Sequence, residues 1–366
     1  MSVLEDRYRS LLRLLPASYR GVWEEEMVAT FLQSVETDDA DYADYLADFG
    51  RPSLSEVARV AALAVRLRLA GVGAPPDCFA WGEAVRRVAL IGLLAQAMWA
   101  PLEVGFSLWS VGKIPWLPAP PADSPFHVPP SMWQVAWGLV GLVWVAAYLA
   151  LVFGYRRAGQ VLAVLAFVPL AADRIIATVG HASRLGAPAF EFALIWSDLL
   201  ITALPLLALA AFHRDAPPVP RRPWLVALGV GIALHIALAF LMLPPPMHEP
   251  ALWMMVLDPP SVWSIALVAA AVVHLTRLAL GRTALTPTWP LALALLAPAV
   301  LAARVLTLLP YAFSSQFVPR SMLPVGILEA VAVLAVGIAL AVLAAQALRR
   351  LSPAPAEPAA SYTPTR

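Results

Sequence analysis

Long apolar runs dominate this sequence and restrict what it can fold into. Runs such as 131–153, 224–243 and 323–348 are close to the ~20 residues that a helix needs to cross a bilayer. Charged residues make up only 13% of the chain, against about 25% in soluble domains. We therefore expect an all-α, multi-pass membrane protein that has the lipid bilayer as its main partner.

Eight membrane spans are expected along the chain. They cover 88–110, 131–153, 160–180, 189–212, 224–243, 262–280, 288–309 and 323–348. Cytoplasmic flanks of membrane helices are enriched in arginine and lysine. If the N-terminus is cytoplasmic, the outer connections hold only Lys113, Arg184 and Arg320. This split predicts a cell-membrane protein with both termini in the cytoplasm.

An internal repeat is visible within the membrane region. Pro-Pro-Ser-Met-Trp at 129–133 returns as Pro-Pro-Ser-Val-Trp at 259–263, and the same offset of 130 residues relates Arg174 to Arg304. Because four spans return the chain to its starting side, the two copies have the same orientation. We predict two tandem, parallel four-helix repeats at 84–215 and 216–350. A Pro/Ala-rich tail at 351–366 is expected to be disordered and cytosolic.

Residues 1–83 form an acidic block, with fourteen Asp and Glu against eight Arg. Apolar residues at helical spacing predict several short helices in a small cytosolic domain. Ser53-Leu54-Ser55-Glu56 has the spacing of a capping box and is expected to start a helix that continues to about Leu69. The expected buried faces are Leu4, Tyr8, Leu11 and Leu15; Tyr19, Val22 or Trp23, Met27 and Phe31; Tyr42, Tyr45, Leu46 and Phe49 of a helix at 36–48; and Leu54, Val57, Ala61, Ala64 and Leu67.

Two motifs in this block resemble known cytosolic domains. Residues 11–16 (Leu-Leu-Arg-Leu-Leu-Pro), followed by Tyr-Arg at 19–20 and Trp-Glu-Glu-Glu-Met at 23–27, resemble the helical prefix domain of bacterial permease-type membrane proteins. Phe-Gly-Arg-Pro at 49–52 is similar to the end of HAAS-type cytosolic domains. The resemblance covers about 70 residues. It implies a bacterial membrane protein whose cytosolic domain often occurs beside a PadR-like transcriptional regulator.

Ionisable side chains inside the spans are the candidate functional residues. An unpaired charge in lipid costs about 2.5–3.5 kcal/mol on insertion scales, so such residues pair or line a cavity. We expect a polar network that contains Glu103, Asp173, Arg174 and Asp198, with Arg304 facing it from the second repeat. Secondary candidates are Gln96, Thr178, His181, Glu191, Thr202 and His235. Two interpretations stay open: an outward-opening cavity for an ion, lipid headgroup or small amphiphile, or interhelical ion pairs that stabilise the bundle.

Several classes of protein find no support in the sequence. P-loop, His-Glu-x-x-His and Gly-x-Ser-x-Gly motifs are missing, and the single Cys78 excludes a cysteine zinc site. No enzyme activity, cofactor, metal or nucleic acid is expected. The first functional hypothesis is a sensor or regulatory membrane protein that signals to a cytosolic protein through residues 1–70. The alternative is a transporter or permease subunit, and a lipid-modifying enzyme is the weakest hypothesis.

Overall fold

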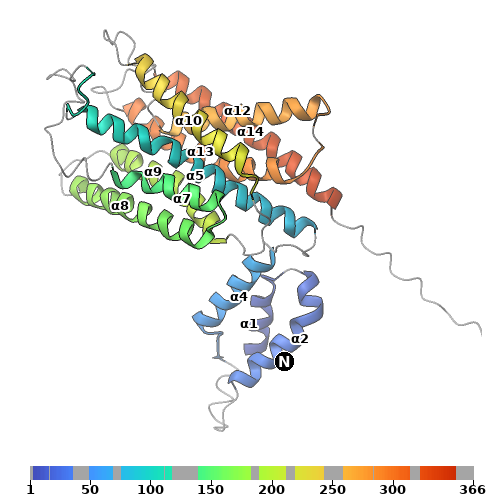
Figure 1. Cartoon of the computed structure of the whole chain (residues 1–366). Coiled ribbons are helices and arrows are strands. Elements are labelled where there is room, and N and C mark those ends of the chain that lie inside the picture. Colours follow the sequence, from blue (N-terminus) through green and yellow to red (C-terminus); the bar gives the residue numbers. More distant parts are fainter. Residues whose placement is uncertain are drawn as a thin grey trace, which may run out of the picture. The chain divides into compact units, whose positions relative to one another are not determined.

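The computed structural model describes residues 3–15, 17–35, 49–68, 76–110, 112–117, 139–182, 189–211, 219–242, 259–282, 284–313 and 322–351. Every regular element in these ranges is an α-helix (Figure 1). The chain divides into two compact units, and each is described by itself. One unit comprises Met1–Glu83 and Ala211–Ala216, and the other comprises Ala84–Ala210 and Pro217–Arg366.

The N-terminal unit contains α1 (Val3–Leu12), α2 (Ala17–Val35) and α4 (Leu54–Arg68). Its core consists of buried residues from these helices and the turn after α1: Leu4, Tyr8, Leu12, Leu15, Val28, Phe31, Val60 and Ala64. The rings of Tyr8 and Phe31 are stacked, with centroids 4.0 Å apart. This contact joins α1 to α2 through a large apolar area and an offset aromatic pair.

The start of α4 confirms the expected helix beginning at Ser53. The Ser53 hydroxyl accepts a hydrogen bond from the Glu56 amide at 3.2 Å, which satisfies one of the backbone donors left open at a helix start. The Glu56 carboxylate accepts a hydrogen bond from the Tyr8 hydroxyl at 3.2 Å. Burial, and then the negative Glu56, raise the pKa of Tyr8 to about 12. Tyr8 therefore ties α1 to α4 in its neutral, hydrogen-donating form.

The expected buried faces of α2 and α4 are partly wrong. Val22 and Trp23 are 71% and 43% exposed. Leu54 is 88% exposed, and the buried side chains of α4 are Val60 and Ala64. The inward face of each helix is therefore turned by about one residue from the expected one. Phe31 is buried as expected and stacks on Tyr8, while Val28 rather than Val22 or Trp23 completes the buried side of α2.

The second unit is the membrane unit, in which the helices are long and apolar. They are α5 (Pro76–Ser110, mostly in this unit), α7 (Val143–Val152), α8 (Arg156–Ala182), α9 (Ala189–Ala211), α10 (Arg221–Met242), α12 (Pro259–Ala279), α13 (Thr288–Phe313) and α14 (Met322–Leu351). Among the described residues, five segments are long and apolar enough to cross a membrane: Cys78–Trp109, Arg156–Gly180, Pro259–Ala279, Thr288–Leu309 and Leu323–Leu351. These helices confirm a membrane protein.

Each of the eight expected spans overlaps one helix of the membrane unit, while the number of actual membrane crossings and the repeat stay predictions. Some expected features cannot be followed in the structure. The helix at 36–48, the motif at 129–133 and the tail from 352 lie outside the described residues.

Close contacts at small residues bring the membrane helices together. A Cβ atom on Gly92 of α5 would overlap the ring of Pro205 on α9, and one on Gly231 of α10 would overlap Met98 of α5. Such close approach at glycine is a common way for membrane helices to associate. Tyr148 of α7 adds a hydrogen bond to the backbone carbonyl of Trp224 on α10 at 2.9 Å. These contacts connect α5, α7, α9 and α10.

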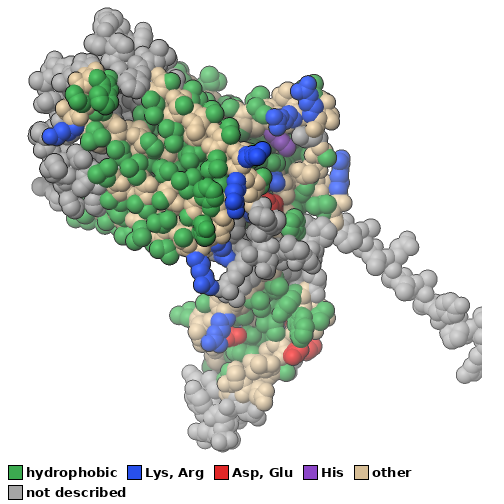
Figure 2. Space-filling view, in the orientation of Figure 1, with side chains coloured by type: hydrophobic (Ala, Val, Ile, Leu, Met, Phe, Trp, Pro, Cys, Tyr) green, Lys and Arg blue, Asp and Glu red, His purple; other side chains and the backbone are tan. Residues whose placement is uncertain are grey.

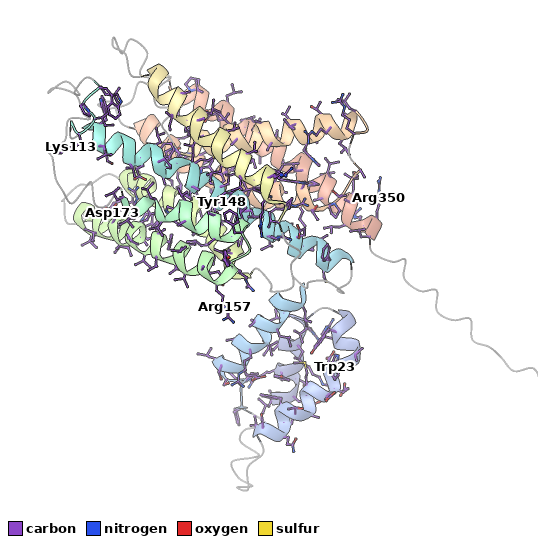
Figure 3. The ribbon with its side chains drawn as sticks, in the orientation of Figure 1. Trp23, Lys113, Tyr148, Arg157, Asp173 and Arg350 are labelled. Atoms are coloured by element: carbon purple, nitrogen blue, oxygen red, sulfur yellow. The ribbon has the colours of Figure 1, made fainter. Side chains whose placement is uncertain are left out.

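Basic side chains mark one end of the membrane unit. Arg87 of α5 donates to the hydroxyl of Thr288 at 2.6 Å, and its guanidinium lies over the Trp289 ring at the start of α13. Figure 2 shows most of the visible basic side chains of this unit toward one end of its apolar surface. In Figure 3, Arg157 and Arg350 lie at that end, and Lys113 and Asp173 lie toward the opposite end. The helix ends rich in arginine therefore share one side of the bundle.

Candidate functional site

A cavity of about 330 Å³ lies among the helices of the membrane unit. Its walls come from α5, α8, α9, α10, α12 and α13 and from residues 140–144 at the start of α7. Most of the walls are aliphatic, and three tryptophans contribute to them. The polar lining residues are Gln96, Glu103, Asp173, Arg174, Thr202 and His235. The cavity thus brings together three residues of the expected network and three of the secondary candidates.

The two acidic residues of the cavity lie at the same depth in the bundle. Sixteen residues separate Arg87 from Glu103 on α5, and sixteen separate Arg157 from Asp173 on α8. At 1.5 Å per residue, each acid is about 24 Å along its helix from the basic end. Because the apolar core of a bilayer is about 30 Å thick, both acids lie in the half remote from the arginines.

The carboxylates of Glu103 and Asp173 stand on an open side of the cavity. Both side chains are exposed although they line the cavity, whereas Arg174 between helices is half-buried. Gly141 leaves room beside Glu103, because a Cβ there would lie 3.8 Å from the Glu103 Oε2 atom. Charged groups in a membrane bundle face protein or water rather than lipid. The two exposed carboxylates therefore need water or a partner charge where this part of the bundle lies in a bilayer.

Hydrogen bonds orient the polar groups farther inside. The Gln96 amide donates to the Thr202 hydroxyl at 3.1 Å, which joins α5 to α9. His235 Nδ1 lies 2.8 Å from the Gly231 carbonyl oxygen. A carbonyl can only accept, so Nδ1 carries a hydrogen. The His235 ring meets Trp99 edge-on, with centroids 6.3 Å apart.

Arg304 does not line this cavity, contrary to the expectation that it faces the Arg174 network. Arg304 is completely buried, and its Nε atom lies 2.9 Å from Glu329 Oε2 on α14. Ser261 of α12 donates to the same carboxylate oxygen at 3.0 Å. Thr307 accepts from the guanidinium at 3.3 Å and donates to the Arg304 carbonyl at 2.8 Å. This buried polar cluster ties α12, α13 and α14 together.

The remaining candidates are placed as follows. The Thr178 hydroxyl donates to the Arg174 carbonyl of its own helix at 2.7 Å, and Thr178 is not among the lining residues. The side chains of Asp198, Glu191 and His181 lie outside the described residues. Glu329 and Ser261 belong to the polar cluster around Arg304 but were not among the residues expected from the sequence. Helix positions could have indicated Glu329 as the partner. Counted from the arginine-rich ends of α13 and α14, Glu329 lies only about four residues, or 6 Å, from the depth of Arg304.

The donor set of the cavity suits an organic ligand better than a metal ion. In the described ranges, no group of three or more His, Cys, Asp or Glu side chains is placed to hold a metal.

Comparison with protein-family models, with curated proteins and with solved structures finds no match to this chain. Its function is therefore inferred from the cavity and from the N-terminal unit.

Proposed function

We propose that this chain is a bacterial cell-membrane sensor that binds a small amphiphilic molecule inside its helix bundle. It has eight spans in two four-helix repeats, and both termini are cytoplasmic. The observation that supports the proposal best is the cavity, which combines apolar walls with six polar side chains, two of them carboxylates at the same depth. Ligand sites of this kind combine apolar walls with a few placed polar groups.

The N-terminal unit supplies the output of the sensor. Val22, Trp23, Phe49 and Leu54 are exposed there, with Leu54 at 88%. Exposed apolar side chains on a small domain are typical of a protein interaction site. The proposed partner is a cytosolic protein that docks on residues 1–70. The prefix- and HAAS-like motifs of the sequence agree with this role.

Ligand binding can be measured on the full-length protein in nanodiscs. The probes are dansyl-labelled twelve-carbon amphiphiles with cationic, zwitterionic or anionic heads. Ala266→Trp fills the cavity from α12, and Ala269→Trp makes the same change at an exposed position that does not line it. We expect saturable binding of at least one probe, weakened about tenfold or more by Ala266→Trp because it fills a tight apolar site. Equal binding to the two variants, or binding no greater than to empty nanodiscs, would rule out the cavity.

A transporter is the second candidate, because helices of both proposed repeats line the cavity. Proteoliposomes loaded with the probe that binds distinguish the two. Flux that depends on the protein and is lost in Ala266→Trp would favour transport. If no probe flux is seen, loss of binding to the cytosolic partner on deletion of residues 1–70 would favour the sensor.

The proposed orientation has a direct test, because the chain contains a single cysteine. In a Cys78→Ala background, an impermeant maleimide should label Lys113→Cys on intact cells. Arg157→Cys should react only after permeabilisation. The reverse pattern would place both termini outside.

A further inference from the structure

The charge of the cavity lining points to the chemistry of its ligand. The ionisable lining residues in the described part of the chain are Glu103, Asp173, Arg174 and His235. Two carboxylates therefore stand against one guanidinium. The described lining thus carries one more negative than positive charge. A bound cation would neutralise that charge, whereas a bound anion would leave both acids unfavourably placed in a low-dielectric site.

The aromatic lining favours a cation in the same way. Trp99, Trp144 and Trp263 come from α5, α7 and α12 and line one cavity. The face of an indole ring carries negative potential and attracts organic cations, with tryptophan the strongest of the aromatic residues. His235, whose ring meets Trp99 edge-on, lines the same part of the cavity. Acceptors and aromatic rings together form the kind of site that binds ammonium groups.

The rest of the lining excludes a small inorganic cation. Ca²⁺ takes six to eight oxygen ligands and Mg²⁺ requires an octahedral shell. Most cavity walls are Ile, Leu, Val, Ala and Met side chains, such as Ile91, Leu170, Val262 and Leu293. Walls of this kind stabilise hydrocarbon at about 25 cal/mol per Å² buried. The ligand therefore has an apolar body as well as a charge.

We infer that the cavity binds a hydrophobic organic cation, an amine or onium compound, whose charge lies beside Glu103 and Asp173 and within reach of the tryptophan rings, and whose apolar part contacts the aliphatic walls. This inference rests on the proposed function of the cavity and adds the class of ligand. Entry would occur from the side of the two exposed carboxylates, remote from the arginine-rich end.

Matched probes of equal shape and opposite charge test the inference. The full-length protein in nanodiscs is equilibrated with radiolabelled tetraphenylphosphonium, tetraphenylborate or neutral triphenylphosphine oxide, with empty nanodiscs as background. We expect saturable binding of the cation at least tenfold tighter than of the anion or the neutral compound. Glu103→Gln and Asp173→Asn should each weaken cation binding about tenfold, the range for a lost charged contact. Glu83→Gln, the same change on α5 away from the cavity, should leave it unchanged.

The binding results distinguish a wrong ligand class from a cavity that binds no ligand at all. If the anion or the neutral compound binds as tightly as the cation, or if both cavity variants retain cation affinity, the assigned ligand class is wrong although the cavity binds ligand. If no probe binds above empty nanodiscs and Ala266→Trp changes nothing for the dansyl amphiphiles, the proposed function itself fails. Unchanged elution of each variant on size exclusion shows that the fold is retained. A Trp99→Leu variant gives an independent readout, with cation affinity lowered about fivefold while anion affinity is unchanged.

Discussion

Two arginines in the membrane unit, Arg174 and Arg304, occupy opposite environments. They stand 130 residues apart, at matching positions of the proposed repeats. Arg304 is completely buried and lies 2.9 Å from Glu329. Arg174 is half-buried and lines a cavity together with two exposed carboxylates. One arginine therefore forms a buried ion pair between helices, whereas the other lines a cavity.

For the proposed repeats, the difference means that one arginine is held in a closed ion pair while its counterpart lines a cavity. A buried ion pair holds its helices together, and loss of one partner leaves an unfavourable buried charge. An exposed charge in a cavity is solvated and contributes little to stability. We therefore expect the Arg304 cluster to maintain the bundle and the Arg174 cavity to bind the ligand. Variants in the two regions should separate stability from binding.

The largest effect is expected from removal of Glu329. Glu329→Ala leaves Arg304 buried without its ion-pair partner, and loss of one member of such a pair costs about 3–5 kcal/mol. The free energy of unfolding, measured by SDS titration of the reconstituted protein, checks this value. Glu103→Ala is the control and should change stability by less than about 1 kcal/mol. Equal losses in the two variants would remove the distinction between the regions.

A smaller loss is expected when Gly326 gains a side chain. A Cβ at this position would lie 2.7 Å from Nη2 of Arg304 and would also overlap Leu308. Overpacking of this kind costs about 1–3 kcal/mol, so Gly326→Ala should lower the melting temperature. Gly180→Ala on α8 is the matched change, because a Cβ there meets nothing within 4 Å. A melting temperature for Gly326→Ala at or above that of Gly180→Ala would contradict the tight packing around Arg304.

Removal of one hydroxyl group should lower the free energy of unfolding by about 1 kcal/mol more in the Arg304 cluster than beside Arg174. Thr307 is 1% exposed and connects the Arg304 guanidinium to its own helix, so Thr307→Val leaves buried groups without a partner. Thr178→Val removes only a bond to the Arg174 carbonyl and should stay within about 0.5 kcal/mol of the wild type. Chemical unfolding of both variants measures the difference. If Thr178→Val is the more damaging, the first repeat has the tighter polar packing.

The smallest expected effect is the coupling of Arg174 to Asp198. These residues correspond in sequence to Arg304 and Glu329, with Asp198 offset by 131 rather than 130 residues. A double-mutant cycle with Arg174→Gln and Asp198→Asn should give a coupling of at most about 0.5 kcal/mol, because Arg174 is only half-buried. The cycle with Arg304→Gln and Glu329→Gln should give a several-fold larger value. Equal couplings would show that both repeats retain the same ion pair.

Much of the architecture could be predicted from the sequence because it depends on local patterns. Ser53 caps a helix, as its spacing from Glu56 predicts. Apolar runs of membrane length locate helices that are long enough to cross the bilayer. The inward faces of α2 and α4 were less predictable. Val22 and Trp23 share a helical pattern with the core residue Phe31, but Val28 takes the buried position, which depends on packing against the other helices of the unit.

The cavity could be predicted in part, from charge and depth. Glu103, Asp173 and Arg174 were expected together because charged groups at similar depth avoid lipid, and all three line one cavity. The partner of Arg304 was missed because Glu329 lies near the end of its span. The long arginine side chain covers the remaining distance along the helix. The three tryptophans of the cavity were not expected there, since helix rotation is not visible in their sequence positions.

The ion pair of Arg304 with Glu329 also bears on how the chain is made. Arg304 leaves the ribosome about 25 residues before its partner, so α13 alone would present an unpaired cation to the membrane. Entry of that charge is unfavourable by about 2.5–3.5 kcal/mol. We therefore expect α13 and α14 to enter the bilayer together as a hairpin. A nascent chain that ends before α14 would be recognised as unassembled and would be degraded.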